Sequence, residues 1–248
     1  MTTGSLESGE FAALPSQLGT SRFGRPLHVI PRVTSTNDVA RSLAEDGAGE
    51  GTAVLALEQS GGRGRLGRSW ASPAGGLYLS VILRPSLPVL LWPVLSLAAA
   101  VGSAEGIEAA AGMPVKLKWP NDLLVDARKV GGILLDSGAG FAVAGIGINV
   151  GASPGTLPEG AVSIDVALAP LARAVLQHLE SAIDAVYADP TGTIRQWKAR
   201  SVTLGRPVHV TGAEVFEGVA EDIDRDGALV VRTPSGVRRV VAGDVSLR

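Results

Sequence analysis

The longest apolar stretch of the sequence, from Leu87 to Ala104, limits what this chain can fold into. It contains Pro88 and Pro93, and Glu105 and Glu108 follow it at once. A membrane span needs about 20 apolar residues without such interruptions. We therefore expect a helix that starts near Pro93 and is buried inside a soluble protein, with no membrane contact.

The composition is compatible with a large core and excludes several classes of protein. The chain has 248 residues, of which 46% are apolar and 19% charged, so one sizeable α/β domain, or one domain with a small appendage, is expected. The net charge of −2 argues against a protein that coats nucleic acid. Because there is no cysteine, disulfides, thiolate nucleophiles and cysteine-ligated metals are excluded. No secretory signal is visible at the N-terminus, so we expect a cytoplasmic protein.

Residues 23–201 alternate between apolar runs typical of strands and segments with helical periodicity. Strands are expected at 28–33, 52–59, 77–85, 115–119, 122–126, 129–136 and 141–150. Helices are expected at 35–46, 93–111 and 171–186, the first with Ser35 as N-cap and Asp38 at capping-box spacing. Tight turns between the later strands favour largely antiparallel pairing.

The two ends of the chain differ from this central part. Residues 1–22 are small, polar and acidic, and they predict a flexible N-terminal arm. Residues 202–248 consist of short β-branched runs separated by turns, which indicates a small C-terminal β-barrel. We therefore place the catalytic or binding domain at residues 23–201.

A loop rich in glycine and arginine, EQSGGRGRLGRSW at residues 58–70, joins two of the expected strands. Its glycines allow positive φ angles and close approach to an anion, and its three arginines offer planar forks for phosphate or carboxylate. The common nucleotide-binding pattern GxxxxGK[ST] does not occur, and no GxGxxG match stands where a Rossmann turn would need it. The loop is interpreted either as a phosphate cradle or as a flexible basic loop, including an RG segment that contacts RNA.

Several motifs in a fixed order resemble one known family. GRGRLGR (62–68) closely resembles the biotin-and-ATP loop of bacterial biotin–protein ligases, and KWPND (118–122), ARKVGGIL (127–134) and GIGINV (145–150) follow in that family's order. The triplet STN (35–37) precedes them all. The resemblance implies an α+β fold, with a mixed, largely antiparallel sheet packed with helices as in class II synthetases. A small SH3-like C-terminal β-barrel would follow, in the monofunctional type without an N-terminal DNA-binding domain.

The resemblance also implies a two-step ligase reaction. The biotin carboxylate attacks the α-phosphate of ATP, and a lysine of a biotin carboxyl carrier protein domain of an acyl-CoA carboxylase then attacks the biotinyl-adenylate. Because the first step brings two anions together, the site must supply positive charge and positioning. The resemblance makes Lys129, Arg65 and Asp122 the expected catalytic residues, with ATP and biotin as substrates and Mg²⁺ as cofactor.

The binding residues implied by the resemblance fall into three groups. The biotin-binding residues are Ser35, Thr36, Asn37, Gln59, Gly62, Arg63, Gly64, Arg65, Lys129, Gly145 and Gly147. The ATP-binding residues are Arg63, Arg65, Arg68, Trp70, Lys118, Asn121, Lys129 and Asn149. Candidate Mg²⁺ contacts are Asn149 and Asp122, and Asp122 could instead orient the acceptor lysine or accept its proton. A structural ion pair remains open for Arg68, and close packing remains open for the two glycines of the 145–150 motif.

Other functions remain as alternatives. A lipoate–protein ligase of the same superfamily would share Lys129 but not the GRGRLGR loop, and the related octanoyl transferases need a cysteine. An RNA-binding module or a biotin-responsive repressor is the non-enzymatic alternative. Only 34 residues precede Ser35, so we expect no DNA-binding domain and no DNA partner. The expected oligomeric state is a monomer or a weak homodimer.

Overall fold

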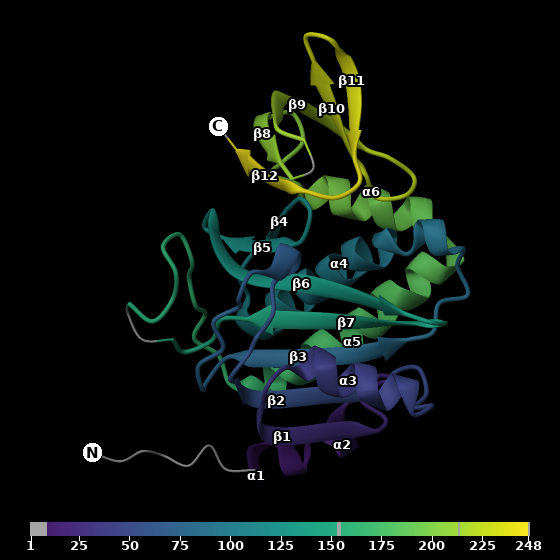
Figure 1. Cartoon of the computed structure of the whole chain (residues 1–248). Helices are drawn as coiled ribbons and strands as arrows, with labels where there is room; N and C mark the ends of the chain where they lie inside the picture. Colours follow the sequence, from purple (N-terminus) through teal and green to yellow (C-terminus); the bar gives the residue numbers. More distant parts are fainter. Residues whose placement is uncertain (1–8, 153–154, 213, 248) are drawn as a thin grey trace.

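A seven-stranded sheet forms the centre of the larger part of the molecule (Figure 1). The computed structural model of the chain describes residues 9–152, 155–212 and 214–247. The strands are β1 (Leu27–Val33), β2 (Ala53–Gln59), β3 (Leu77–Leu83), β4 (Lys116–Lys118), β5 (Asp122–Val125), β6 (Arg128–Gly138) and β7 (Phe141–Ile148). Their order is β1-β2-β3-β7-β6-β5-β4, and only β1 and β2 pair in parallel. The expected mixed, largely antiparallel sheet is confirmed.

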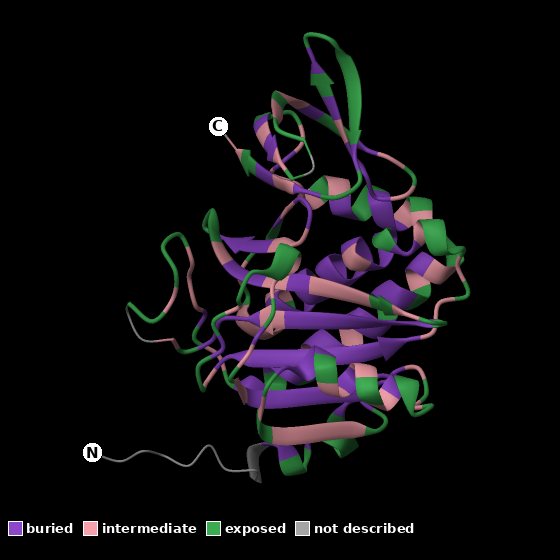
Figure 2. Ribbon diagram, viewed as in Figure 1, coloured by how far each residue is buried: buried purple, intermediate pink, exposed green. Residues whose placement is uncertain are grey.

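The central strands are apolar on both faces because helices cover both sides of the sheet. All seven residues of β3 are buried, whereas the edge strand β1 exposes Pro31 and Arg32 (Figure 2). Helix α3 (Thr36–Glu45) lies on one face, and α4 (Pro93–Ala111) and α5 (Leu168–Ala188) lie on the other (Figure 1).

Helix α4 is the central helix of the core. It is the one helix in the described part of the chain that is long and apolar enough to cross a membrane, but 67% of that stretch is buried inside the protein. Two glycines let α5 approach it, since a Cβ at Gly106 would lie 2.6 Å from Val175 Cα and one at Gly102 would lie 2.8 Å from His178 O. This close packing fits a helix that is buried at most positions from Val94 to Ile107, while Glu105 and Glu108 pair with Arg200 at its surface.

The flexible arm predicted for residues 1–22 is wrong for residues 9–22, and residues 1–8 lie outside the described part. Two short helices, α1 (Gly9–Ala12) and α2 (Leu14–Gln17), place Phe11, Leu14 and Leu18 in the core. These apolar residues have the spacing i, i+3, i+7, which puts them on one face of a helical segment. Glu180 on α5 then accepts hydrogen bonds from the backbone N–H groups of Ser21 and Arg22 at 2.9 and 2.7 Å.

A small β domain packs on the end of the molecule that carries β4 and β5 (Figure 1). Asp189 ends α5 as expected, but it also caps a further helix, α6 (Pro190–Arg200), by accepting a hydrogen bond from Thr191 N. The domain's five strands are β8 (Pro207–Thr211), β9 (Phe216–Ile223), β10 (Leu229–Thr233), β11 (Gly236–Val240) and β12 (Asp244–Leu247). They form an antiparallel sheet in the order β11-β10-β9-β8-β12, and the hydrophobic core of the larger part continues into it.

Candidate active site

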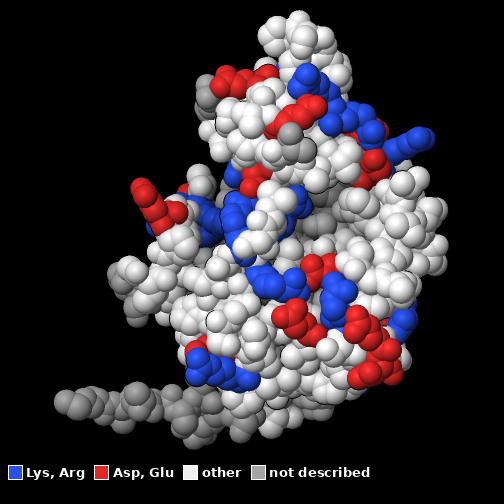
Figure 3. All heavy atoms as spheres, viewed as in Figure 1, with Lys and Arg blue, Asp and Glu red and all other residues white. Residues whose placement is uncertain are grey.

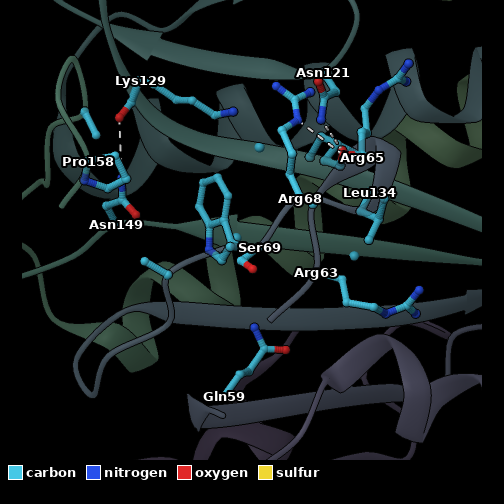
Figure 4. A pocket seen from close by; sticks show the side chains of 18 of the residues that line it. Gln59, Arg63, Arg65, Arg68, Ser69, Asn121, Lys129, Leu134, Asn149 and Pro158 are labelled. Carbon is cyan, nitrogen blue, oxygen red and sulfur yellow. Dashed lines mark hydrogen bonds between the residues drawn. The ribbon is translucent and has the colours of Figure 1, made fainter. Parts of the chain in front are cut away.

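A cavity of about 360 Å³ opens between α3, the strands β6 and β7, and the loop that carries the Gly/Arg motif (Figure 4). Segments far apart in the sequence meet there, at residues 35–37, 59–71, 121–134, 145–149 and 157–161. Every motif singled out in the sequence therefore contributes residues to the wall of this one cavity. On the face shown in Figure 3, Lys and Arg side chains gather in the middle, below the small domain.

One end of the cavity, which we call the neutral end, is a hydrogen-bonded network of five uncharged side chains. Its members are Thr36, Asn37, Gln59, Ser72 and Ser80. The Gln59 side-chain oxygen accepts two hydrogen bonds from Thr36, one from the backbone N–H at 2.8 Å and one from the hydroxyl at 3.1 Å. The Ser80 hydroxyl lies 2.8 Å from Thr36 Oγ1 and 2.6 Å from Asn37 Oδ1. A satisfied buried network of this kind holds its side chains in one arrangement.

Ser35 begins α3, as expected, but the predicted capping box is wrong. The Ser35 side chain makes no capping hydrogen bond, although the residue is 2% exposed and lines the cavity. Asp38, the expected partner position, instead contacts Arg63 from the Gly/Arg loop, Oδ1 to Nη2, at 2.7 Å. The sequence correctly located the start of the helix but not the partner of its first acidic residue.

Glycine is required at these positions of the site mainly because a Cβ would collide with a neighbouring side chain, and less because of unusual backbone angles. A Cβ at Gly145 would overlap Asn37 Oδ1, and a Cβ at Gly62 would overlap Ser72 Oγ. In the Gly/Arg loop the positive φ angles belong to Leu66 and Gly67, so Gly67 uses the conformational freedom that the sequence offers, whereas Gly61, Gly62 and Gly64 do not. Gly62 lies behind the cavity and does not line it.

Arg63 connects the neutral end to the charged residues. Its Nη2 lies 2.7 Å from carboxylate oxygens of both Asp38 and Asp136, and the same Asp136 oxygen accepts a hydrogen bond from Asn37 Nδ2 at 2.9 Å. In Figure 4 the Arg63 side chain points away from Lys129 and Gln59. The carboxylates that pair with Arg63 therefore belong to the protein, and a ligand anion would have to compete with them.

At the other end of the cavity, which we call the cation end, three basic residues form the wall: Arg65, Arg68 and Lys129. Lys118, Asp122 and Asp244 lie next to them, outside the wall. Lys129 Nζ lies 2.5 Å from Asp122 Oδ1, and Lys118 Nζ lies 3.5 Å from Asp122 Oδ2. Arg68 Nη2 lies 2.5 Å from Asp244 Oδ2, at the start of β12. Lys118 and Asp122 stand behind Lys129 rather than in the cavity wall.

Arg65 is half-buried, in contrast to the exposed Arg68. Its Nη2 donates a hydrogen bond to Gly243 O at 3.2 Å, while its buried Nε has no hydrogen-bond partner in the described part of the chain. Burial lowers the pKa of the Arg65 guanidinium below its ordinary value, and the nearby Arg68 charge adds to this, against Asp244 and Asp122. The group still carries its charge at neutral pH, because arginine loses its proton only in strong base.

Trp70 lies over the bare backbone of two strands. A Cβ at Gly147 would lie 2.7 Å from Trp70 Nε1, and one at Gly132 would lie 3.4 Å from the edge of the same ring. The Lys129 ammonium lies 5.3 Å from the ring centroid. The indole Nε1 is buried, and the described residues offer it no acceptor. Trp70 therefore sits between the neutral end and Lys129.

Two asparagines on the cavity wall hold backbone segments together. Asn149 Nδ2 donates to Val162 O at 3.1 Å and to Lys129 O at 3.4 Å (Figure 4), and Asn121 Nδ2 donates to Ile133 O at 2.7 Å. Both side chains thus have a structural role, and their amide oxygens remain as possible ligand contacts.

The candidate metal residues do not form a protein metal site. Both Asp122 oxygens face lysine ammonium groups, and the Asn149 amide nitrogen is bonded to backbone. Within residues 9–152, 155–212 and 214–247, no three His, Asp or Glu side chains group around a common point. A divalent cation in this cavity would need most of its ligands from a bound molecule and water.

Three residues of the site were missed by the sequence analysis. Ser80 is the single polar residue in the buried strand β3, and this was the signal that could have identified it. Asp136 follows an apolar run at the far end of β6, and Ser72 follows the Gly/Arg loop. Ser80 contacts Asn37, Asp136 contacts Arg63 and Ser72 contacts Gln59. These pairs are separated in the sequence, so only the fold reveals the contacts.

Comparison with known proteins gives consistent matches along the chain. The model of the biotin/lipoate A/B protein ligase family matches residues 29–153, and that of the biotin protein ligase C terminal domain matches residues 203–248. A biotin–[acetyl-CoA-carboxylase] ligase of Paracoccus denitrificans is 37% identical over 88% of this chain and 98% of its own length. A bifunctional ligase/repressor of Bacillus subtilis is 34% identical over 93% of this chain and 76% of its own.

Solved structures agree with these sequence matches. The biotin protein ligase of Aquifex aeolicus in complex with biotin and ATP has a TM-score of 0.78 and 29% identity, covering 90% of this chain and 98% of that one. The biotin protein ligase of Leishmania major in complex with biotin has a TM-score of 0.64 and 28% identity, covering 87% and 98%.

Proposed function

The chain belongs to the biotin/lipoate A/B protein ligase family, and from this premise we infer that it is a biotin–protein ligase. It activates biotin with ATP and transfers it to a lysine of a carrier protein. The single observation in this molecule that carries the proposal is the cavity with one neutral and one cationic end. Biotin has the matching division, with an uncharged ureido ring at one end and a carboxylate at the other.

We propose that the neutral end binds the ureido ring. The ring presents one carbonyl acceptor and two N–H donors, and the hydroxyls of Ser35 and Thr36 and the amides of Asn37 and Gln59 are suitable partners that line the cavity. The network holds these groups in place before ligand arrives, which lowers the entropy cost of binding. Ser80, which is fully buried and does not line the cavity, is proposed to hold Thr36 and Asn37 in place for the ring.

The cation end is proposed to carry out the activation step. The biotin carboxylate attacks the α-phosphate of ATP, and diphosphate leaves, so two anions must be held together at the reacting atoms. Lys129 lies on β6 at the cavity wall, where its ammonium can exchange Asp122 for the carboxylate and α-phosphate oxygens. Arg63, Arg65 and Arg68 come from one loop and would cover the product, which protects the anhydride from water.

The transfer step is proposed to use Asp122. Once Lys129 moves to the ligand, Asp122 is left with Lys118 at 3.5 Å and becomes free to orient or deprotonate the acceptor lysine. Mg²⁺ is proposed to enter as the complex with ATP, because the carboxylates of the described residues do not group into a site for it. Asn149 and Asn121 would contact the nucleotide through their amide oxygens.

The direct test is incubation with ATP, Mg²⁺, biotin and a biotin carboxyl carrier domain, followed by intact mass measurement of the carrier. We expect one added biotinyl group that depends on both ATP and biotin. A carrier of unchanged mass would contradict the proposal. Calorimetry with biotin and with lipoate tests the specificity, since the lipoate alternative is disfavoured by relatives named as biotin ligases.

The same proposal covers location and partners. We propose a cytoplasmic enzyme whose protein partner is the carrier domain of an acyl-CoA carboxylase, present as a monomer or weak homodimer. Absence of DNA binding stays a prediction, and a gel shift with operator DNA tests it.

A further inference from the structure

The turn that leads to Asp122 is held from outside its own hairpin. Trp119, three residues before Asp122, is 2% exposed and donates two buried hydrogen bonds. Its backbone N–H donates to Thr203 Oγ1 at 2.9 Å, and its indole Nε1 donates to Gly227 O at 3.1 Å. We propose that Thr203 is a positioning residue for the transfer step, which acts through Trp119 to hold the Asp122 carboxylate beside the attacking amine. This inference rests on the proposed ligase function.

The hairpin that carries the turn is weakly supported by its own strands. β4 is three residues long and is the last strand of the seven-stranded sheet, and the register of β5 shifts between Leu123 and Leu124. A short edge strand forms few ladder hydrogen bonds, so it opens more easily than the central strands. The segment 201–203 lies along the other side of β4, where Val202 N donates to Leu117 O at 2.9 Å. The chain beyond α6 therefore supplies the contacts that this edge lacks.

Thr203 is suited to fix the turn because it is itself fixed. The residue is fully buried, and its backbone N–H donates to Ser201 Oγ at 3.0 Å. Without the Thr203 hydroxyl, the buried N–H of Trp119 would be left without an acceptor, which is more costly than the loss of an exposed hydrogen bond. The hydroxyl, and not only the shape of the side chain, is therefore required here.

The acceptor of the indole N–H belongs to a braced turn. Gly227 N donates to Asp224 O at 2.9 Å, which closes the turn between β9 and β10. Arg239 on β11 contacts the carboxylates of Asp224 and Asp226, at 2.6 and 2.7 Å. Trp119 is thus held at its backbone and at its ring, so that neither shift nor rotation of the residue is free.

Asp122 depends on this support once the ligand is bound. Its ion partners are the flexible side chains of Lys129 and Lys118, and Lys129 is proposed to move to the ligand, which leaves Lys118 Nζ at 3.5 Å. In the transfer step the acceptor lysine Nζ forms a bond to the biotin carboxyl carbon, the bond from that carbon to the phosphate oxygen breaks, and the proton of the amine passes to Asp122. Displacement of a reacting group by about 1 Å can lower the rate by about 100-fold.

Lys129, in contrast, is held by contacts that do not involve Trp119. Its backbone N–H donates to Gly160 O at 3.0 Å, and its carbonyl accepts from Val162 N at 2.9 Å. The activation step, which is proposed to use Lys129, should therefore be insensitive to Thr203. This difference between the two steps makes the inference testable.

The test compares two buried threonines. Thr203→Val removes the acceptor of the Trp119 N–H, whereas Thr193 is 3% exposed and its hydroxyl has no hydrogen-bond partner in the described part of the chain. We expect Thr203→Val to lower the single-turnover rate of transfer from preformed adenylate, at saturating biotin carboxyl carrier domain, by about ten-fold, which corresponds to about 1.4 kcal/mol. Thr203→Ser retains the hydroxyl and should recover the rate within about two-fold. Thr193→Val should transfer biotin at the wild-type rate.

Two readouts separate positioning from general support of the fold. Biotin-dependent exchange of diphosphate into ATP should stay within about two-fold of wild type in Thr203→Val, because Lys129 keeps its backbone contacts. In an Asp122→Asn background, Thr203→Val should cause no further loss of transfer, since its effect passes through that carboxylate.

An unchanged transfer rate in Thr203→Val, an equal loss of exchange, or a full additional loss in the Asp122→Asn background would overturn the proposal. If Thr203→Val does not fold, Trp119→Phe decides instead, because it removes the bond to Gly227 O and keeps an aromatic ring. It should show the same selective loss of transfer, and equal rates in both steps would count against the proposal. A wild-type protein without biotin-dependent exchange would overturn the proposed function itself.

Discussion

The neutral end and the cation end of the cavity share walls but are stabilised in different ways. At the neutral end, buried side chains are satisfied by one another, and an uncharged ligand group can be accepted with little rearrangement. At the cation end, basic groups are paired with the protein's own carboxylates, Asp122 and Asp244, and a ligand anion must replace them. The comparison teaches that one half of the site is prepared for its ligand, whereas the other half must exchange ion partners.

Lys129→Gln is expected to give the largest effect and to act on chemistry rather than on biotin binding. Loss of the ammonium removes the charge between carboxylate and α-phosphate, so adenylate formation should fall by about 1,000-fold. Diphosphate exchange measures this, with biotin affinity from calorimetry unchanged within about three-fold. Lys116→Gln, an exposed lysine on β4, is the control. If biotin affinity and the rate of adenylate formation fell equally, Lys129 would act in biotin binding as well, and the proposed division of roles between the two ends would be wrong.

Gly145→Ala is expected to give the second largest effect, and to act at the neutral end. The new Cβ overlaps Asn37 Oδ1, so the network through Ser80 must shift. Biotin affinity should fall by about 100-fold, or about 2.7 kcal/mol, which is the cost of losing about two hydrogen bonds to buried polar groups. Gly49→Ala is the control, since a Cβ there meets nothing within 4 Å. Wild-type affinity in Gly145→Ala would mean that the neutral end does not bind biotin.

Asp38→Asn tests the exchange of ion partners with a smaller effect. Asp38 is half exposed and competes with ligand anions for Arg63. Its removal should tighten binding of a stable biotinyl-adenylate analogue by about three-fold at low salt, and the gain should vanish at high salt. Asp46→Asn, exposed at the end of the same helix, should have no effect. Weaker binding in Asp38→Asn would indicate that Asp38 supports the site instead.

Glu180→Gln should leave ligand binding at the neutral end and at the cation end unchanged, and should lower only the free energy of unfolding. Burial raises the pKa of Glu180, but hydrogen bonds from Ser21 and Arg22 outweigh it and hold the pKa below the ordinary glutamate value of about 4.3. A lowered folded-state pKa contributes stability above the unfolded pKa, and this is lost as pH falls through the folded value. The variant should therefore have a lower Tm at pH 7, with the difference shrinking below about pH 4. An equal difference at pH 3 would contradict this.

Most of the fold was predictable because its elements have strong local patterns. The helix from Pro93 and the strand containing Ser80 are continuous apolar runs, and their boundaries follow from proline and glycine. The N-terminal segment was not predicted, because Phe11, Leu14 and Leu18 are too few to identify a core face without knowing what they pack against.

The candidate site, like the fold, has some features that the sequence predicts and others that it does not. The motifs located the residues that meet in the cavity, because each is a local pattern of glycine, arginine or lysine. The ion partners could not be predicted, since Arg63 and Asp136, or Arg68 and Asp244, are brought together only by the tertiary structure. The hydrogen bonds of Trp119 to Thr203 and Gly227 depend on how two domains meet, and sequence spacing does not contain this information.

The exchange of ion partners at the cation end can be measured directly in a crystal structure with a stable biotinyl-adenylate analogue. We predict that Lys129 Nζ leaves Asp122 and contacts the ligand's phosphate or linker oxygens, while the ureido ring contacts the neutral end without movement of Thr36 or Gln59. A ligand bound elsewhere, with the Lys129–Asp122 pair intact, would contradict the account.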